Sequence, residues 1–138
     1  GEIDAVITEM ERPNGLTFSP DESLLYVSDT SEFDYPQGHH DIRVYDIIEG
    51  RRATNGRVFT VVEPGQPDGM RVDELGHLFA SSGDGVQVFT IDGTRLGKIR
   101  TPATCANLTF GGSKRNRLII AAGDSLYTID VQTRGMQS

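Results

Sequence analysis

Two short motifs hold the side chains best suited to chemistry in this sequence, Pro13-Asn14-Gly15 and Pro67-Asp68-Gly69. Each sets one oxygen-bearing side chain between a proline, which fixes its own φ, and a glycine, which lets another backbone approach closely. An amide carbonyl and a carboxylate, with no sulfur or imidazole beside them, form a hard-oxygen set that suits Ca²⁺, Mg²⁺ or Mn²⁺. The alternative is that both motifs are simply good turns.

Both motifs open a longer repeat. After Asn14 the sequence alternates apolar and polar residues, turns, and continues as the apolar run 24–27. The same pattern recurs from Asp68 and again from Asn107, so the opening residues are 54 and 39 positions apart. Once the unpatterned loop 30–41 is set aside, the period is ~40 residues with four short strands, which is typical of a β-propeller blade. Chance repetition is the alternative.

The composition also predicts an all-β chain, because 16 glycines and 6 prolines punctuate many short apolar runs and leave little helical periodicity. We predict a single partial β-propeller domain over residues 1–138, with blades at about 1–62, 63–104 and 105–138. Known propellers have about 4–8 blades, so three do not close a ring. The missing half then comes from a longer parent protein, of which this chain is the C-terminal piece, or from a second copy.

Three segments give weaker patterns. Residues 3–8 alternate loosely and predict a leading strand, and residues 49–56 predict a charged turn before a strand at 57–62. Residues 131–138 lack an apolar pattern, which predicts a frayed tail. These segments set the expected limits of the first and third blades.

Charge and composition exclude several classes of partner. The net charge of −7 argues against nucleic acid, and no apolar run approaches the ~20 residues of a membrane helix, so we expect no membrane partner. Residues 1–4 lack the features of a signal peptide. The single cysteine, Cys105, cannot form an internal disulfide, which leaves the compartment open, with the cytoplasm slightly favoured over the periplasm or secretion.

The three repeats resemble the SMP-30/gluconolactonase/LRE family. The matching segments are 13–16 with 18–21 and 25–29, then 67–70 with 76–79, then 107–112 with 118–120. This resemblance implies a six-bladed propeller with one divalent cation on the channel axis, calcium first and magnesium, manganese or zinc as alternatives. It also implies the hydrolysis of sugar lactones and related esters, with a small-molecule lactone as the substrate.

Carried over residue by residue, Asn14 matches the family's asparagine metal ligand. Asp68 matches its aspartate ligand, which is also the proposed general base. The family's glutamate ligand, its second asparagine, and the arginine and glutamate that often touch the sugar have no counterpart here. We therefore expect the parent protein to be a metal-dependent lactonase and this chain to supply part of the site. The alternative is a non-catalytic propeller that serves as a binding or scaffold module.

Other polar residues have more ordinary interpretations. His39 and His40 are adjacent on the long loop, where His40 either contacts substrate at the channel mouth or supports the loop. Cys105 precedes a strand and is interpreted as a buried structural thiol. Asp29 and Asp84 lie near strand ends and are interpreted as backbone caps.

Overall fold

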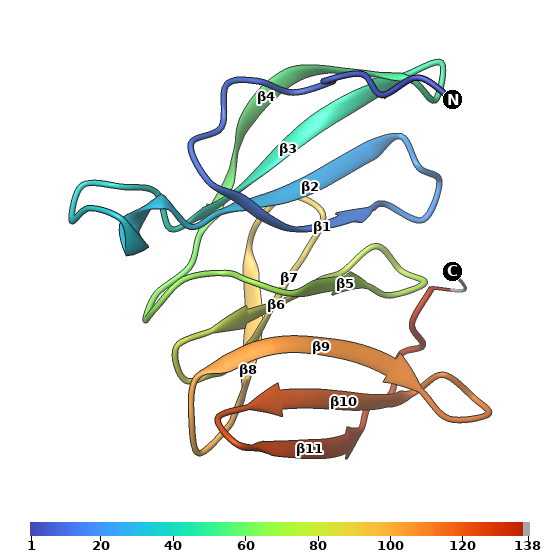
Figure 1. The fold of residues 1–138 in the computed structure, drawn as a ribbon. Coiled ribbons are helices and arrows are strands. Elements are labelled where there is room, and N and C mark those ends of the chain that lie inside the picture. Colours follow the sequence, from blue (N-terminus) through green and yellow to red (C-terminus); the bar gives the residue numbers. More distant parts are fainter. Residues whose placement is uncertain (137–138) are drawn as a thin grey trace.

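The computed structural model describes residues 1–136, and these form eleven strands in three antiparallel sheets (Figure 1). The first sheet has the order β1 (Pro13–Phe18), β2 (Leu24–Asp29), β3 (Asp41–Ile48) and β4 (Arg52–Val61). The second has the order β5 (Met70–Val72), β6 (Leu78–Ser82), β7 (Gly85–Phe89) and β8 (Arg95–Arg100). The third contains β9 (Cys105–Gly111), β10 (Arg117–Ala122) and β11 (Ser125–Asp130). The predicted all-β class is confirmed.

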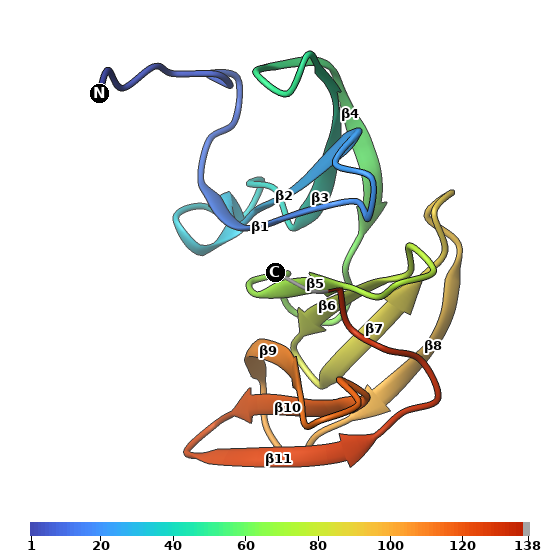
Figure 2. The same cartoon turned by 90° about the vertical axis from the view of Figure 1, so that its right-hand side faces the viewer.

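The three sheets fan out from a common side. Figure 2 shows β1, β5 and β9, the first strand of each sheet, along one side, and β4 and β8 along the other. Each sheet is a meander in which neighbouring strands pair in sequence order, as in a propeller blade. The first strands therefore form the hub. The blade boundaries at about 62 and 104 stay a prediction, since they fall in the connections between sheets.

The apolar core lies between the sheets, in two clusters. Because side chains alternate along a strand, Leu78 and Ala80 of β6 face the first sheet, whereas Phe79 faces the third. The buried side chains of the first cluster are Tyr26, Ile42, Val44, Val62, Met70, Val72, Leu78, Ala80 and Phe89. Those of the second are Phe79, Val86, Cys105, Leu108, Leu118, Ile120 and Ala122. The middle sheet is thus packed on both faces, which fixes its strands relative to both neighbours.

Two expected boundaries in the first sheet were wrong. Residues 3–8 form no strand, and the chain is instead held where the Glu11 N–H donates to the Asp29 carboxylate. β4 begins at Arg52 rather than at 57, because Glu49 and Gly50 at positive φ make a tight turn that ends sooner than expected. Of the charged residues that suggested a longer turn, Glu49 and Arg51 do lie in the turn, whereas Arg52 begins the exposed outermost strand.

The expected frayed tail was also wrong for residues 131–136. Gly135 forms an antiparallel bridge with Asp73, and the Met136 N–H donates to the Val72 carbonyl at 3.2 Å. Arg115 clamps the same segment, because its Nη1 donates to the Gly135 carbonyl at 2.7 Å. In Figure 2 this segment runs from β11 back to β5. Backbone hydrogen bonds, which leave no apolar pattern in the sequence, hold it there; residues 137 and 138 lie outside the described part.

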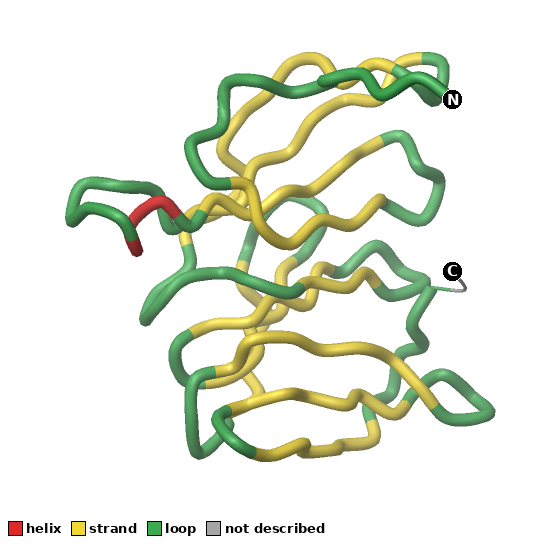
Figure 3. The backbone as a smooth tube through the Cα atoms, viewed as in Figure 1, coloured by secondary structure: helices red, strands yellow, loops and turns green. Residues whose placement is uncertain are grey.

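The long loop between β2 and β3 projects from one end of the first sheet (Figure 3). It contains a 3-10 turn, η1 (Ser31–Phe33), and closes on itself where the His39 N–H donates to Ser31 Oγ at 2.7 Å. Arg12 holds it from outside by an ion pair with Asp34 at 2.9 Å. Among residues 1–136, no helix has the length and apolar character needed to cross a membrane.

Candidate functional site

The backbones of the two predicted site motifs touch at the hub, between β1 and β5. Gly15, which follows Asn14, has no room for a side chain, because a Cβ there would overlap the carbonyl oxygen of Asp68. Ser28 of β2 is fully buried beside them, and its Oγ accepts from the Gly15 N–H at 2.8 Å. The same hydroxyl donates toward the carbonyl oxygens of Gly15 and Asp68, both at 3.3 Å. One serine thus ties the two motifs together.

An equivalent serine holds Asp68 from within its own sheet. The Asp68 N–H donates to Ser81 Oγ at 2.8 Å, and the Ser81 N–H donates to the Gly69 carbonyl at 3.0 Å. Ser81 is fully buried, like Ser28. Sequence reasoning missed both serines. The signal was present, since each stands on the second strand of its repeat, opposite the glycine of the motif.

The third repeat is offset by one residue at the hub. Leu108 pairs with Ile120 as Met70 pairs with Ala80, so Asn107 takes the position of Gly69 rather than that of Asp68. The Asn107 side chain lies against Gly69, where a Cβ would overlap its Oδ1. Oδ1 also accepts from the Leu108 N–H at 2.9 Å. Asn107 therefore packs beside the Asp68 motif instead of repeating it.

Asp68 has unusual electrostatics for this protein. It is partly buried, and burial raises the pKa of its carboxyl above the ordinary value of 3.8. Within residues 1–136 its carboxylate has no hydrogen-bond donor and no ion-pair partner, although its backbone is held at both N–H and C=O. A carboxylate that is desolvated but unpaired is suited to bind a cation or to accept a proton.

A groove runs along the hub strands, on the C-terminal side of the Asn14 and Asp68 motifs. It has a volume of about 550 Å³ and is lined by β1, β5 and β9, with Met136 of the docked tail at one end. Asn14 stands at the start of β1 and Asp68 just before β5, so both lie at the other end of these strands. A smaller pocket of about 300 Å³ adjoins β9 and includes Arg71 and Asn107.

His40 is tied to the chain between β4 and β5. Its Nδ1 lies 2.9 Å from the Val62 carbonyl, which requires a proton on Nδ1, and its Nε2 is 4.0 Å from a Glu63 carboxylate oxygen. This contact supports the loop in the way the sequence suggested. Contact between His40 and substrate stays a prediction.

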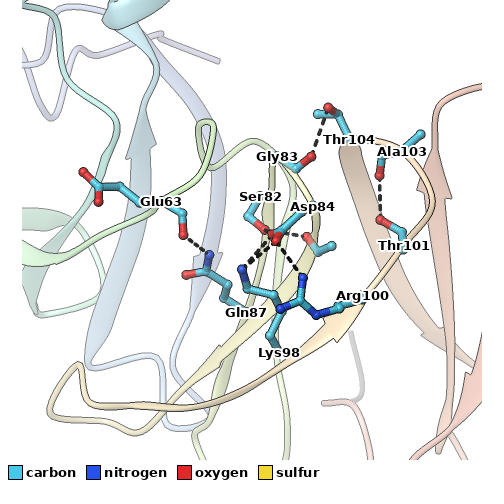
Figure 4. A network of polar contacts seen from close by, with 11 residues as sticks. Glu63, Ser82, Gly83, Asp84, Gln87, Lys98, Arg100, Thr101, Ala103 and Thr104 are labelled. Atoms are coloured by element: carbon cyan, nitrogen blue, oxygen red, sulfur yellow. Dashed lines mark hydrogen bonds and ion pairs between the residues drawn. The ribbon is translucent and has the colours of Figure 1, made fainter.

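Two of the remaining interpretations hold and one does not. Burial raises the pKa of the Cys105 thiol to about 11, as expected for a structural thiol. Burial alone would raise the pKa of Asp29, but hydrogen bonds from the Glu11 and Ser31 N–H groups lower it, so Asp29 is the expected backbone cap. Asp84 is not a cap. Figure 4 shows Lys98 and Arg100 converging on its carboxylate, with Lys98 Nζ at 2.8 Å.

Comparison with known proteins decides the family. The model of the SMP-30/Gluconolactonase/LRE-like region matches residues 1–124. The chain belongs to this family. A gluconolactonase from Zymomonas mobilis is 32% identical over 98% of the chain and 39% of its own length. The gluconolactonase XC5397 from Xanthomonas campestris has 40% identity and a TM-score of 0.79, over 90% of the chain and 39% of that protein.

The propeller fold extends to more distant structures. Regucalcin from Agrobacterium tumefaciens, a calcium-binding protein, superposes with a TM-score of 0.82 at 19% identity, over 98% of the chain and 51% of that structure. The predicted β-propeller is therefore confirmed, as is the family resemblance. The chain spans about two fifths of the length of the gluconolactonases it matches.

Proposed function

We propose that the intact protein hydrolyses a lactone at this hub, with one divalent cation held by Asn14 and Asp68. The observation that carries the proposal is the Asp68 carboxylate, which is desolvated, has a raised pKa and lacks a partner in the described chain. The gluconolactonase relatives from Zymomonas mobilis and Xanthomonas campestris support the reaction class. The calcium-binding regucalcin structure supports calcium as the first choice, with magnesium, manganese and zinc as alternatives.

The residues present fit a hard cation. Asn14 offers an amide oxygen and Asp68 a carboxylate, and a bound cation would compensate the cost of desolvating that carboxylate. No group of three or more His, Cys, Asp or Glu side chains suited to a metal occurs among residues 1–136. We propose that further ligands, with the rest of the ring, come from blades beyond this sequence in the same protein or from a second copy.

A divalent cation, when bound, polarises a lactone carbonyl and stabilises the negative charge that develops on its oxygen. Asp68 serves as the general base that takes a proton from the attacking water. Ser28 and Ser81 hold the backbone of Asp68 from both sides. Asn14 is exposed, and the backbone next to it is held where the Gly15 N–H donates to Ser28 Oγ.

The test is gluconolactone hydrolysis and calcium binding by the intact protein. Asp68→Asn should lower turnover at least about a thousandfold and weaken calcium binding, since it removes the base and replaces a charged ligand by a neutral amide. Asn14→Ala should weaken calcium binding. Asp124→Asn is the matched control, because Asp124 is exposed and, among residues 1–136, its carboxylate accepts a hydrogen bond from Ser125 Oγ alone, and it should leave both measurements within about twofold.

Two results would contradict the proposal. An Asp68→Asn protein with normal turnover and calcium affinity would show that Asp68 is neither base nor ligand. An intact protein that folds and binds no divalent cation, and that hydrolyses none of a panel of lactones, would favour a scaffold propeller instead.

A further inference from the structure

Two asparagines in this sequence are followed by glycine, Asn14 and Asn55. An asparagine side chain loses ammonia most readily in this dipeptide, because the glycine leaves its own backbone nitrogen unhindered. That nitrogen, once deprotonated, attacks the carbonyl carbon of the asparagine side chain. In a folded protein the reaction depends on how firmly the peptide bond between the two residues is held. The structure holds the two peptide bonds differently.

The peptide bond after Asn14 is held at the hub. The Gly15 N–H donates to the Oγ of the fully buried Ser28 at 2.8 Å. A Cβ at Gly15 would overlap the Asp68 carbonyl oxygen, so this backbone also has little room to move. The Gly15 nitrogen can reach the Asn14 side chain only if the peptide bond turns and the hydrogen bond to Ser28 breaks. The fold therefore resists deamidation of Asn14, although its side chain is exposed.

The peptide bond after Asn55 lies at the surface. Asn55 and Gly56 are both exposed, and they stand in β4 where its pairing with β3 shifts between Val44 and Asp46. Asn55 has a φ of 54°, in the left-handed region that few residues other than glycine, asparagine and aspartate adopt. An exposed and irregular stretch of an outermost strand opens more easily than a buried hub strand.

The exposure of Asn55 does not come from an absent blade. Its Nδ2 donates to Asp46 Oδ2 at 2.8 Å, and Arg57 Nη1 donates to Asp46 Oδ1 at 3.0 Å. Arg57 pairs directly with Val44, so the two side chains share one face of the first sheet. Val44 belongs to the core cluster between the first and second sheets. Asn55 and its two partners therefore lie on the face that the described second sheet covers, near its exposed edge.

We propose that Asn55 is a site of spontaneous deamidation and that Ser28 protects Asn14 from the same reaction. At Asn55 the Gly56 nitrogen gives its proton to hydroxide and bonds to the side-chain carbonyl carbon. The bond from that carbon to the amide nitrogen breaks, and ammonia leaves with a proton taken from water. Water then opens the succinimide ring to aspartate or isoaspartate. The net change is one water consumed and one ammonia released.

Arg57 favours the first step. Its Nη1 donates to the Asn55 carbonyl oxygen at 2.9 Å, and this oxygen shares the negative charge when the Gly56 nitrogen loses its proton. The product carries a carboxylate in place of the amide that donates to Asp46, so a hydrogen bond is replaced by a repulsion between like charges. Deamidation of Asn55 should therefore loosen β4 and leave the hub unchanged.

The experiment is incubation of the intact protein at mildly alkaline pH with a calcium chelator, followed by peptide mass spectrometry. Deamidated Asn55 should accumulate at least about tenfold faster than deamidated Asn14, the factor expected when one hydrogen bond must break first. In denaturant the two sites should react at similar rates, which measures their reactivity without the fold. Because the chelator removes any bound cation, the result is independent of the proposed function.

The protection of Asn14 is tested by two serine variants. Ser28→Ala should speed deamidation of Asn14 about tenfold, because the Gly15 N–H loses its acceptor. Ser81→Ala is the matched control, since it removes a buried serine whose hydroxyl accepts from Asp68 instead, and it should leave the rate at Asn14 unchanged. The melting temperature of each variant shows how much general loss of stability contributes.

The reactivity of Asn55 is tested by two arginine variants. Arg57→Gln should slow its deamidation about three- to tenfold, because the charged donor to the Asn55 carbonyl is lost. Arg117→Gln, which removes another exposed arginine from an ion pair, should leave the rate unchanged. Equal rates at Asn14 and Asn55 in the folded protein would overturn the proposal. An unchanged rate at Asn14 in Ser28→Ala would overturn the role of Ser28.

Discussion

Two aspartates flank the same three-residue strand, and the structure treats them in opposite ways. Asp68 precedes β5, is partly buried, and has a carboxylate with no donor among the described residues. Asp73 follows β5 and is fully buried, yet its carboxylate accepts from the Leu75 and His77 N–H groups, from His77 Nδ1 and from Thr133 Oγ1. The deeper carboxylate is therefore the better satisfied one.

This difference distinguishes a structural role from a functional one. A buried carboxylate with four donors stabilises the fold, and here it fastens the segment 131–136 to the turn after β5. A carboxylate desolvated without donors costs stability, which a protein tolerates where a ligand compensates it. The backbone of Asp68 is held by Ser28 and Ser81, so the missing donors do not reflect a loose segment.

The largest expected effect comes from removing the satisfied aspartate. Asp73→Ala should lower the free energy of unfolding by about 3–5 kcal/mol, since it leaves several buried donors without an acceptor. Asp68→Asn should lower it by less than about 0.5 kcal/mol or raise it, because only a desolvated charge is lost. Urea denaturation of the intact protein in the presence of a calcium chelator measures both. If the two variants lost similar stability, the contrast between the aspartates would be wrong.

The next effect concerns the two buried serines. Ser28→Ala should lower the free energy of unfolding by about 2 kcal/mol and Ser81→Ala by about 1 kcal/mol. The Ser28 hydroxyl contacts both hub motifs, whereas the Ser81 hydroxyl contacts the second one. The loss of the Ser28 hydroxyl therefore leaves more backbone groups unsatisfied. Ser28→Ala should also weaken calcium binding. Exposed Ser125→Ala is the control. Equal losses for the two buried serines would show that Ser28 does not couple the blades.

The sequence was enough to predict the repeat, because period-two alternation and turn residues recur after Asn14, Asp68 and Asn107. It also predicted that Asn14 and Asp68, the first residues of the first two repeats, occupy equivalent positions. It did not predict the one-residue offset at Asn107, which depends on strand register and on the close approach of Gly69. Register between distant strands follows from packing, which a local pattern does not encode.

The role of Asp73 and the docked tail could not be predicted for a different reason. The contacts of Asp73 with Thr133 and Gly135 join residues 60 or more positions apart, the first between side chains and the second through backbone groups that every residue carries. Nothing in the composition of 131–136 marks it as a binding partner. Likewise, an exposed outer strand such as β4 has the polar residues of a turn, so its start was misplaced.

The smallest effect is a pH dependence that isolates Asp68. Burial raises its pKa in the folded protein above 3.8, the value expected when unfolded, so the folded state binds this proton more tightly. The resulting stability is present below pH 3.8 and is lost as pH rises through the folded pKa. Aspartates with lowered pKa values, such as Asp21 at about 2, make stability change with pH in the opposite direction. Both the wild type and Asp68→Asn contain these aspartates, so the difference in stability between the two proteins isolates Asp68.

Without calcium, the melting temperature of Asp68→Asn minus that of the wild type should therefore increase as pH rises above 3.8 and then level off. The partial exposure of Asp68 keeps the change small. Calcium at neutral pH should stabilise the wild type and reverse the sign of the difference, because the charged wild-type carboxylate binds the cation more tightly than the neutral amide that replaces it. A difference that stays flat between pH 3 and 8, with and without calcium, would mean that the Asp68 carboxylate is solvated like any surface aspartate and that the hub does not depend on its charge.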